Sequence, residues 1–527
     1  MTPETVIRTR LKWRRNPTVC LTLTFSLAAQ QPPPTPPPAD AFRAVTRLVV
    51  LDVVVTDRSG HPVKNRQRED FTVFEDGVRQ TVSLFESAEQ RSQFPAVAER
   101  KHGAVLIPAP PEQSALSPSA ISVLVLDELN SDIHDQAEAR VAIQKFLKTR
   151  GPQLNQPTAL MLLGQKRLEL LHDYTQNADA LLAALNQRHA ELPFGMMTSE
   201  TYGAGERFGK TLWALQQIGD ANAHFGGRKN VIWVGPGFPA INELRRIGAD
   251  RWNQLEDAIG KTASRLWEAR VAVYTLNPKG LEVTPEQYAS LGINSSALLV
   301  GTQDQATGDL LFEGVALQTG GRILRLRNDL DVAIGESMDD GQSYYTLAYY
   351  PNNRDWHDQF RSVGVIVRGE SLQARTRPGY FATAERAPTD DQIQTILSRA
   401  VMNPVTFKAL QFSVATTPAR GISVRYLIKV DRRGLEWQTL PNGKRRCEIT
   451  AVTANVGSGD NITSHRVREL ESLVDGKHFE DQWGKPVTFE LGAQLPPSTR
   501  QVRIVIRDMN NGHIGSIDLS REQLPLR

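Results

Sequence analysis

Cysteine is scarce in this chain of 527 residues, which holds only Cys20 and Cys447. Two cysteines exclude a disulfide-rich scaffold and a structural zinc site made of four cysteines. An excess of one charge is also lacking: 61 Lys and Arg face 58 Asp and Glu, and 61 − 58 leaves +3. A balance this small is not the general electrostatic footprint of a nucleic-acid-binding protein. The composition therefore predicts no nucleic-acid partner.

Long hydrophobic runs are missing too. The apolar stretch 18–29 (TVCLTLTFSLAA) has twelve residues, whereas a membrane-spanning helix needs about 20. It follows the basic segment 8–15 and ends in small residues. This order is typical of a secretory signal peptide, with a short buried N-terminal helix as the alternative. We therefore expect residues 1–29 to be removed during export to the periplasm or the cell exterior, leaving a mature chain with Cys447 alone and no transmembrane span.

Changes of composition divide the rest of the chain. Six prolines in residues 31–40 indicate an extended spacer. Short β-branched segments joined by turn residues predict β structure on both sides of a central region. The predicted parts are a signal peptide (1–29), a Pro-rich linker (30–43), a small β module (44–90), a linker (91–118), a central α/β domain (119–380), a linker (381–391) and a C-terminal β-sandwich-like domain (392–527).

The central region alternates between continuous apolar runs and helical patterns. Its apolar runs are five or six residues long, which suits strands that are buried on both faces. This alternation predicts an α/β fold with a doubly wound, mostly parallel sheet. Ligands of such sheets bind beyond the carboxyl ends of the strands. The residues at these ends are Asp127, Gly164, Gly235 and Asn277.

Six segments of the central region form a specific combination. They are LVLDELNSDIHDQAEARVAIQKFLK (124–148), LLHDYTQN (170–177), GRKNVIWVGPGFP (227–239), VAVYTLNPKGL (271–281), LQTGGRIL (317–324) and DDGQSYYTLAYYP (339–351). In this order they resemble a von Willebrand factor A-type domain. With flanking segments such as DFTVFEDGVRQTV and VRIVIRDMNNGHIGSIDLS, the chain is most similar to the VWFA-related family of Acidobacteria over about residues 42–527.

The resemblance implies a metal-ion-dependent adhesion site, in which D-x-S-x-S, a threonine and a further aspartate hold Mg²⁺. Asp127 and Ser131 match the ends of the first motif, but its middle serine is Leu129, and Gly235 replaces the further aspartate. Spacing alone does not place the threonine: Thr198, Thr201 and Thr211 are all candidates, and Thr201 is taken as the third ligand of the predicted site. Because only one charged oxygen ligand is assured, we expect Mg²⁺ to bind weakly or not at all. Asp127 would alternatively cap the helix that starts near residue 133.

The resemblance also implies a function. We expect an exported, non-enzymatic protein of the adhesion type that binds a protein partner at the cell envelope. Asp127 and Ser131 would lie at the docking edge, with Asn130, Gly235 and Asn277 on its rim. No catalytic residues or further cofactors are predicted.

Two alternatives stay open. The first is a metal-dependent hydrolase that uses the acidic cluster Asp127, Glu128, Asp132 and Asp135. The second is a structural envelope component, in which the β modules bind and the A-type domain is a spacer.

Overall fold

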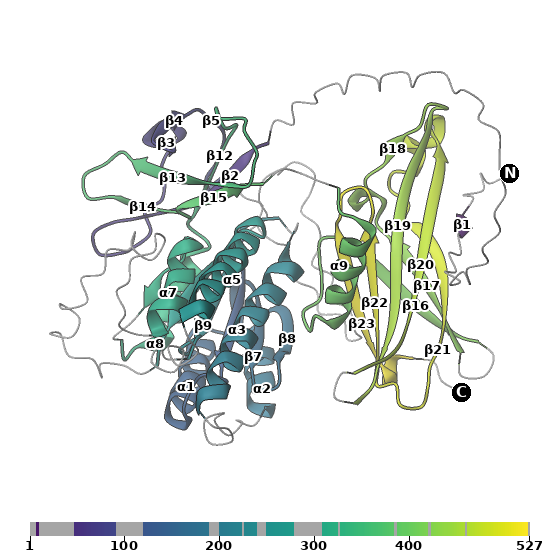
Figure 1. Cartoon of the computed structure of the whole chain (residues 1–527), viewed down its shortest axis with the longest axis horizontal. Helices are drawn as coiled ribbons and strands as arrows, with labels where there is room; N and C mark the ends of the chain where they lie inside the picture. Colours follow the sequence, from purple (N-terminus) through teal and green to yellow (C-terminus); the bar gives the residue numbers. More distant parts are fainter. Residues whose placement is uncertain are drawn as a thin grey trace, which may run out of the picture.

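The computed structural model describes residues 7–9, 47–90, 120–188, 200–223, 226–239, 249–278, 308–324, 327–383, 387–419, 423–458 and 461–524. The predicted cleavage site, the Pro-rich linker and the linker 91–118 lie outside these residues. The described residues form an α/β domain, a β module beside it and a C-terminal β part (Figure 1). Among these residues, no helix has both the length and the apolar character that crossing a membrane requires.

The α/β domain is built on one six-stranded sheet in the order β11-β10-β9-β6-β7-β8. Every neighbouring pair is parallel except β7 and β8 at one edge, so the predicted mostly parallel sheet is confirmed. The strands are β6 (Ile121–Asp127), β7 (Gln153–Leu163), β8 (Leu168–Asn177), β9 (Lys229–Val234), β10 (Val271–Leu276) and β11 (Ile323–Leu324). Because the order reverses between β6 and β9, a crevice for ligands is expected at that point.

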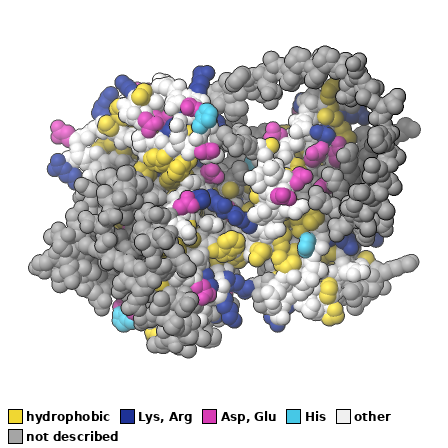
Figure 2. Space-filling view, in the orientation of Figure 1, with side chains coloured by type: hydrophobic (Ala, Val, Ile, Leu, Met, Phe, Trp, Pro, Cys, Tyr) yellow, Lys and Arg dark blue, Asp and Glu magenta, His cyan; other side chains and the backbone are white. Residues whose placement is uncertain are grey.

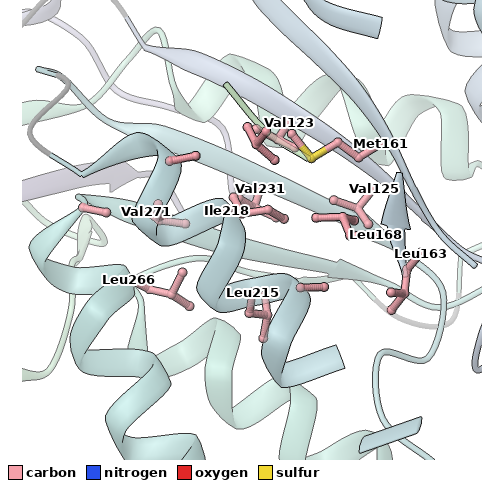
Figure 3. Packing of buried hydrophobic residues seen from close by; sticks show 14 of the residues in the cluster. Val123, Val125, Met161, Leu163, Leu168, Leu215, Ile218, Val231, Leu266 and Val271 are labelled. Carbon is pink, nitrogen blue, oxygen red and sulfur yellow. The ribbon is translucent and has the colours of Figure 1, made fainter. Parts of the chain in front are cut away.

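Helices cover both faces of this sheet because its strands are apolar on both sides. Leu124 and Leu126 face one cluster, which includes residues of α1 (Ile133–Thr149), α2 (Ala178–Gln187) and α8 (Leu330–Asp340). Val123 and Val125 face the other, where Leu215, Ile218 and Leu266 pack against the strands (Figure 3). The helices on this second face are α3 (Glu200–Asn222), α5 (Ala249–Glu268) and α7 (Gly308–Gln318). The sheet is therefore doubly wound, as predicted.

The β module joins two distant parts of the sequence. Its two sheets have the orders β14-β2-β12-β5 and β15-β13-β3-β4, and they share one hydrophobic cluster. The early strands are β2 (Val49–Thr56), β3 (Phe71–Glu75), β4 (Val78–Gln80) and β5 (Val82–Glu86). The late strands are β12 (Tyr345–Tyr349), β13 (Gln359–Val367), β14 (Gln373–Arg375) and β15 (Gly379–Ala382).

This pairing does not follow the predicted division at residue 119. The segment 345–380 was assigned to the α/β domain, yet its strands complete the β module. The physical reason is that YTLAY in β12 is buried along its whole length, as a strand of the parallel sheet would be. An apolar run indicates that a strand is buried, but it does not indicate to which sheet the strand belongs.

The C-terminal part contains two further sheets that share a hydrophobic cluster. One sheet contains β16 (Phe412–Pro418), β17 (Ser423–Val430) and β21 (Val487–Gln494). The other contains β18 (Gln438–Thr439), β19 (Lys444–Val456), β20 (Ile462–Asp475), β22 (Gln501–Asp508) and β23 (Ile514–Ser520). Cys447 is buried in this cluster, and burial raises the pKa of its thiol to about 12. The thiol is therefore a packing group and not a reactive nucleophile.

The outer edge of β20 pairs with a short strand from the start of the chain. This strand is β1 (Ile7–Thr9), and its three residues lie opposite Leu470–Ser472. Because β1 lies inside the predicted signal peptide, cleavage at the predicted place would remove it from β20.

The C-terminal part packs directly on the α/β domain. Its helix α9 (Asp390–Met402) and the segment after it contribute Leu397, Val401 and Phe407 to the same cluster as α3 and α5. Polar contacts support this junction, since Lys408 forms an ion pair with Asp173 at 2.9 Å. A continuous core therefore joins the two parts.

Candidate functional site at the carboxyl edge of the sheet

The candidate site lies at the reversal of the strand order. β6 and β9 run in parallel, and Leu126 lies opposite Val234 near their carboxyl ends. The next residues along each chain, Asp127 and Gly235, therefore meet at one edge. The loop from β6 to α1 adds Asn130 and Ser131 to the same place. The structure thus brings together four of the residues that the sequence assigns to the ligand edge.

Asp127 is the centre of this site and is fully buried, with 0% of its surface exposed. Its Oδ2 accepts hydrogen bonds from the Trp233 indole at 3.0 Å and the Gly237 backbone N–H at 2.8 Å. Its Oδ1 accepts one from the Asn130 backbone N–H at 3.0 Å. Burial raises the pKa of Asp127, and these hydrogen bonds oppose the rise. The carboxylate is therefore held by protein donors in a closed pocket.

The side-chain amide of Asn130 fills the space in front of this carboxylate. Its Nδ2 lies 3.2 and 3.1 Å from the two Asp127 oxygens, 3.0 Å from Thr211 Oγ1 and 2.7 Å from the Gly237 carbonyl oxygen. The Thr211 hydroxyl donates to the same carbonyl at 2.7 Å. An amide nitrogen has two hydrogens, so it cannot satisfy four oxygens at once. The four oxygens thus surround one small donor, as they would surround a cation.

Two glycines make this close packing feasible. Gly235 has a φ of +142°, and a Cβ at this position would lie 2.6 Å from the Asp127 Cβ. Gly237 has a φ of +80°, and a Cβ there would lie 2.2 Å from the ring of Phe312. The aspartate that the family pattern places near Gly235 therefore has no room in this chain.

The prediction that Asp127 and Ser131 lie at an accessible docking edge is wrong, because both side chains are buried. Ser131 is 2% exposed, and its hydroxyl donates to the Asp127 carbonyl oxygen at 2.5 Å. Gly235 is also buried, whereas Asn130 and Asn277 are half-buried. The physical reason is that Trp233 and Asn130 satisfy the carboxylate from inside the protein. A partner therefore has no direct access to Asp127 or Ser131.

The threonine of the site is Thr211. It lies on α3 with 0% exposure and contacts both Asn130 and Gly237. Thr201 lies one residue after the start of α3 and its side chain is outside the described atoms, while Thr198 lies outside the described residues. Sequence spacing did not decide between these three candidates. The structure places Thr211 within hydrogen-bonding distance of the loop after β9.

Leu129 and Trp233 were the residues whose roles sequence reasoning missed. Leu129, at the middle position of the D-x-S-x-S pattern, is buried in the main core. Trp233 belongs to the apolar strand β9, and its ring also packs on Phe312 with centroids 5.0 Å apart. No sequence signal marks its indole N–H as a donor to Asp127, because only the fold places β9 beside β6.

Glu128 and Asp132, two acids close to Asp127 in the sequence, have hydrogen-bond partners of their own. Glu128 accepts a hydrogen bond from Arg140 Nε at 2.9 Å, within a buried ion pair. Asp132 caps α1 by accepting from the Asp135 backbone N–H at 2.9 Å, so it, and not Asp127, is the capping residue. Within the residues that the structure describes, no group of three or more His, Cys, Asp or Glu side chains is arranged to hold a metal ion.

Comparison with known proteins gives similarities of fold only. No protein-family model and no curated protein sequence matches the chain. An aerotolerance-related membrane protein from Bacteroides fragilis NCTC 9343, with multiple mutations to serines, is 11% identical; the match covers 42% of this chain and 98% of that one, with a TM-score of 0.24. The SpRpn10 VWA domain is 15% identical, with coverages of 30% and 73% and a TM-score of 0.17. The TFIIH p34 N-terminal domain is 14% identical, with coverages of 42% and 96% and a TM-score of 0.19. The resemblance to a von Willebrand factor A-type domain therefore stays a prediction from the sequence.

Proposed function

We propose that the chain is an exported, non-enzymatic protein that binds a protein partner at the cell envelope, as an adhesion-type protein does. The proposal places the contact surface on the β module and not at the closed edge around Asp127. It is carried by one observation, a pair of exposed aromatic side chains on β13 and β15. The signal-peptide pattern of residues 1–29 supports the export part of the proposal.

The aromatic pair is Phe360 and Phe381, which we call the Phe patch. The two residues lie directly opposite each other in the sheet, and their ring centroids are 5.4 Å apart. They are 40% and 41% exposed, and Figure 2 shows hydrophobic side chains gathered over β13 and β15. The buried ring of Trp267 lies behind both, 6.1 Å from Phe360 and 6.0 Å from Phe381. Rigid, clustered aromatic rings of this kind are typical anchors of protein interfaces.

This placement favours the alternative in which the β modules bind and the α/β domain is a spacer. The hydrolase alternative is less well supported, because Glu128 and Asp132 are held by Arg140 and by the start of α1. A deletion of residues 119–350 does not test the spacer alternative cleanly. It would remove β12, which lies between β2 and β5 in the β module.

We expect replacement of the Phe patch to abolish partner binding without unfolding the chain. Full-length protein with a photoreactive phenylalanine analogue at position 360 or 381 should crosslink in its native cells to one discrete protein. Phe360→Ser with Phe381→Ser should reduce recovery of that protein at least about tenfold, because aromatic anchors contribute about 2 kcal/mol or more each. The measurement is the yield of crosslinked product by mass spectrometry.

The matched control replaces two equally exposed apolar residues of the α/β domain. Val141 on α1 is 59% exposed and Val332 on α8 is 47% exposed. Val141→Ser with Val332→Ser should leave recovery of the partner unchanged. Equal loss in both double variants, or crosslinking from position 141 to the same protein, would show that the Phe patch is not the contact surface.

We also propose that the Asn130 amide takes the place of a metal ion at the closed edge. This explains why an acid, a threonine and a carbonyl converge there although the second aspartate of the family pattern is missing. A magnesium ion requires an octahedral set of oxygens and usually keeps several waters. The amide nitrogen lies within 3.2 Å of both Asp127 oxygens, so the ion and the amide exclude each other.

Calorimetry with Mg²⁺ and Mn²⁺ tests this exclusion. The unchanged chain should show no micromolar affinity for either ion. Asn130→Ser removes the amide and supplies a hydroxyl, so Mn²⁺ should bind at least about tenfold more tightly, which is about 1.4 kcal/mol. Adding Asp127→Ala to that variant should remove the gain. Micromolar binding to the unchanged chain that is lost in Asp127→Ala would instead show that the amide does not close the site.

A further inference from the structure

A cavity of about 740 Å³ lies between the β module and the segment that links α7 to β11. Gly321 marks this place, since a Cβ there would lie 1.7 Å from the carbonyl oxygen of Val273. The volume falls in the range of about 300–1,000 Å³ that is usual for small-molecule sites.

The charge of the cavity wall is strongly positive. Four arginines line it, namely Arg58, Arg322, Arg375 and Arg377. Asp57 is the one acid among the described lining residues. Its Oδ1 already accepts the backbone N–H groups of Ser59 at 2.8 Å and His61 at 3.0 Å. Four positive charges and one negative charge leave the lining residues at +3. The one carboxylate, that of Asp57, is already hydrogen-bonded within its own turn.

The partners of these arginines do not balance them. Arg375 forms an ion pair with Asp340. The nearest acid of Arg322 is Glu336 at 3.8 Å, and Glu336 lies closer to Arg327, at 2.8 Å. Within the described parts of the chain, Arg58 and Arg377 form no ion pair.

Several donors at the wall have no acceptor. Arg375 Nη1, Thr376 Oγ1 and Arg377 Nε are buried without a hydrogen-bond partner, and all three residues line the cavity. Buried donors without an acceptor are rare, and they are suited to binding an anionic ligand. Burial lowers the pKa of Arg377, an effect that the nearby Arg270 increases. An anion in the cavity would oppose both effects, because a nearby negative charge favours the charged guanidinium group.

The rest of the wall is apolar. Leu317 of α7, Val363 and Val365 of β13, and Pro378 contribute hydrocarbon surface beside the guanidinium groups. Guanidinium groups bind carboxylates and phosphates through paired hydrogen bonds, and apolar walls bind the body of an organic ligand. We propose that this cavity binds a small organic oxyanion, a phosphate or a carboxylate with an apolar body. The proposal is independent of the proposed protein partner.

Calorimetry of the full chain with inorganic phosphate, phenyl phosphate, benzoate and phenol tests the proposal at about 0.15 M NaCl, a salt level that screens exposed charges. Phenyl phosphate should bind at least about tenfold more tightly than inorganic phosphate, because its ring buries apolar surface. The tighter of phenyl phosphate and benzoate identifies the preferred anion. Phenol has the ring without the charge and should not bind.

Arg58→Gln with Arg322→Gln removes two charges from the wall with little loss of fold contacts. This variant should bind the preferred anion at least about tenfold more weakly. Arg79→Gln with Arg354→Gln makes the same change of charge at exposed residues away from the cavity, and should change the affinity less than about twofold. Far-ultraviolet circular dichroism confirms that both variants are folded. The proposal is overturned by absence of binding up to about 10 mM, by binding of phenol that equals binding of phenyl phosphate, or by equal losses in both variants.

Discussion

Asp127→Ala is expected to lower the free energy of opening of β6 and β9 by about 3–5 kcal/mol, because it leaves several buried donors without an acceptor. These donors are the Trp233 indole and the backbone N–H groups of Asn130 and Gly237. Each buried unpaired donor costs about 1–3 kcal/mol, and removal of the unfavourable buried charge offsets part of the sum. Hydrogen exchange of the amides in the two strands measures the change.

Two further substitutions test whether the loss in Asp127→Ala comes from the polarity of this side chain and not from its volume or its place in the loop. Asp127→Asn has the same shape, but its NH₂ group faces either Trp233 and Gly237 or the Asn130 backbone N–H, so a loss of about 2 kcal/mol is expected. Asp132→Ala is the matched control in the same loop. Its exposed carboxylate accepts one backbone N–H from Asp135, and loss of a helix cap costs about 1 kcal/mol. An equal effect of Asp127→Ala and Asp132→Ala would contradict the closed site.

The contribution of Asp127 to the stability of the fold should decrease as the pH rises. Burial raises the pKa of Asp127 above its ordinary value of 3.8. A group with a raised folded-state pKa stabilises the fold fully below its unfolded pKa, and this contribution is lost as the pH rises through the folded value. Asparagine cannot titrate in this range. The stability difference between the unchanged chain and Asp127→Asn should therefore shrink as the pH rises from about 4.

Several parts of this site follow from the sequence. Continuous apolar runs placed β6 and β9 in a parallel sheet, and this placed Asp127 and Gly235 at one edge. Ser131 and Asn130 came with them because they lie in the short loop after β6. The missing second aspartate also had structural meaning, since Gly235 leaves no room for a side chain.

The closure of the site was not predictable from the same patterns. It depends on the Asn130 amide reaching Thr211, which lies 81 residues away in the sequence, at 3.0 Å. It also depends on the direction of the Trp233 indole. Such contacts are set by rotamers and by distances of a few tenths of an ångström, whereas hydrophobic patterns report only the face that is buried.

The β module shows the same limit at longer range. The strand β12 pairs with β2 so that Leu347 lies opposite Leu51, almost 300 residues earlier. The hairpin of β3 and β4 was predictable because its turn is local and contains Asp76 and Gly77. The late strands had no local signal for their partners, so the sequence assigned them to the nearer sheet.

A buried ion pair of Glu75 and Arg361 links the early and late strands of the β module. Arg361 Nη1 lies 3.1 Å from Glu75 Oε1, and the side chains are 1% and 2% exposed, respectively. The hydroxyls of Tyr349 and Tyr380 donate to Glu75 Oε2 at 2.7 and 2.8 Å. One carboxylate on β3 thus joins side chains from β12, β13 and β15.

Arg361→Met should lower the free energy of opening of β3, β13 and β15 by about 3–5 kcal/mol, because it leaves Glu75 as a buried charge without a cation. Adding Glu75→Gln should recover part of this loss, since a neutral amide oxygen still accepts from Tyr349 and Tyr380. Hydrogen exchange of segments 71–86 and 359–382 measures both variants. Arg368→Met, at an exposed arginine just after β13, should change the free energy by less than about 0.5 kcal/mol.

The double variant separates a stranded charge from simple loss of packing. In Arg361→Met with Glu75→Gln no buried charge is left without a cation, so the deficit relative to the unchanged chain should be smaller than in Arg361→Met alone. Loss of the stacking of Arg361 over Trp356, at 5.1 Å, would not be reduced by Glu75→Gln. A deficit that Glu75→Gln does not reduce would therefore mean that the arginine holds the β module together by packing and not by charge.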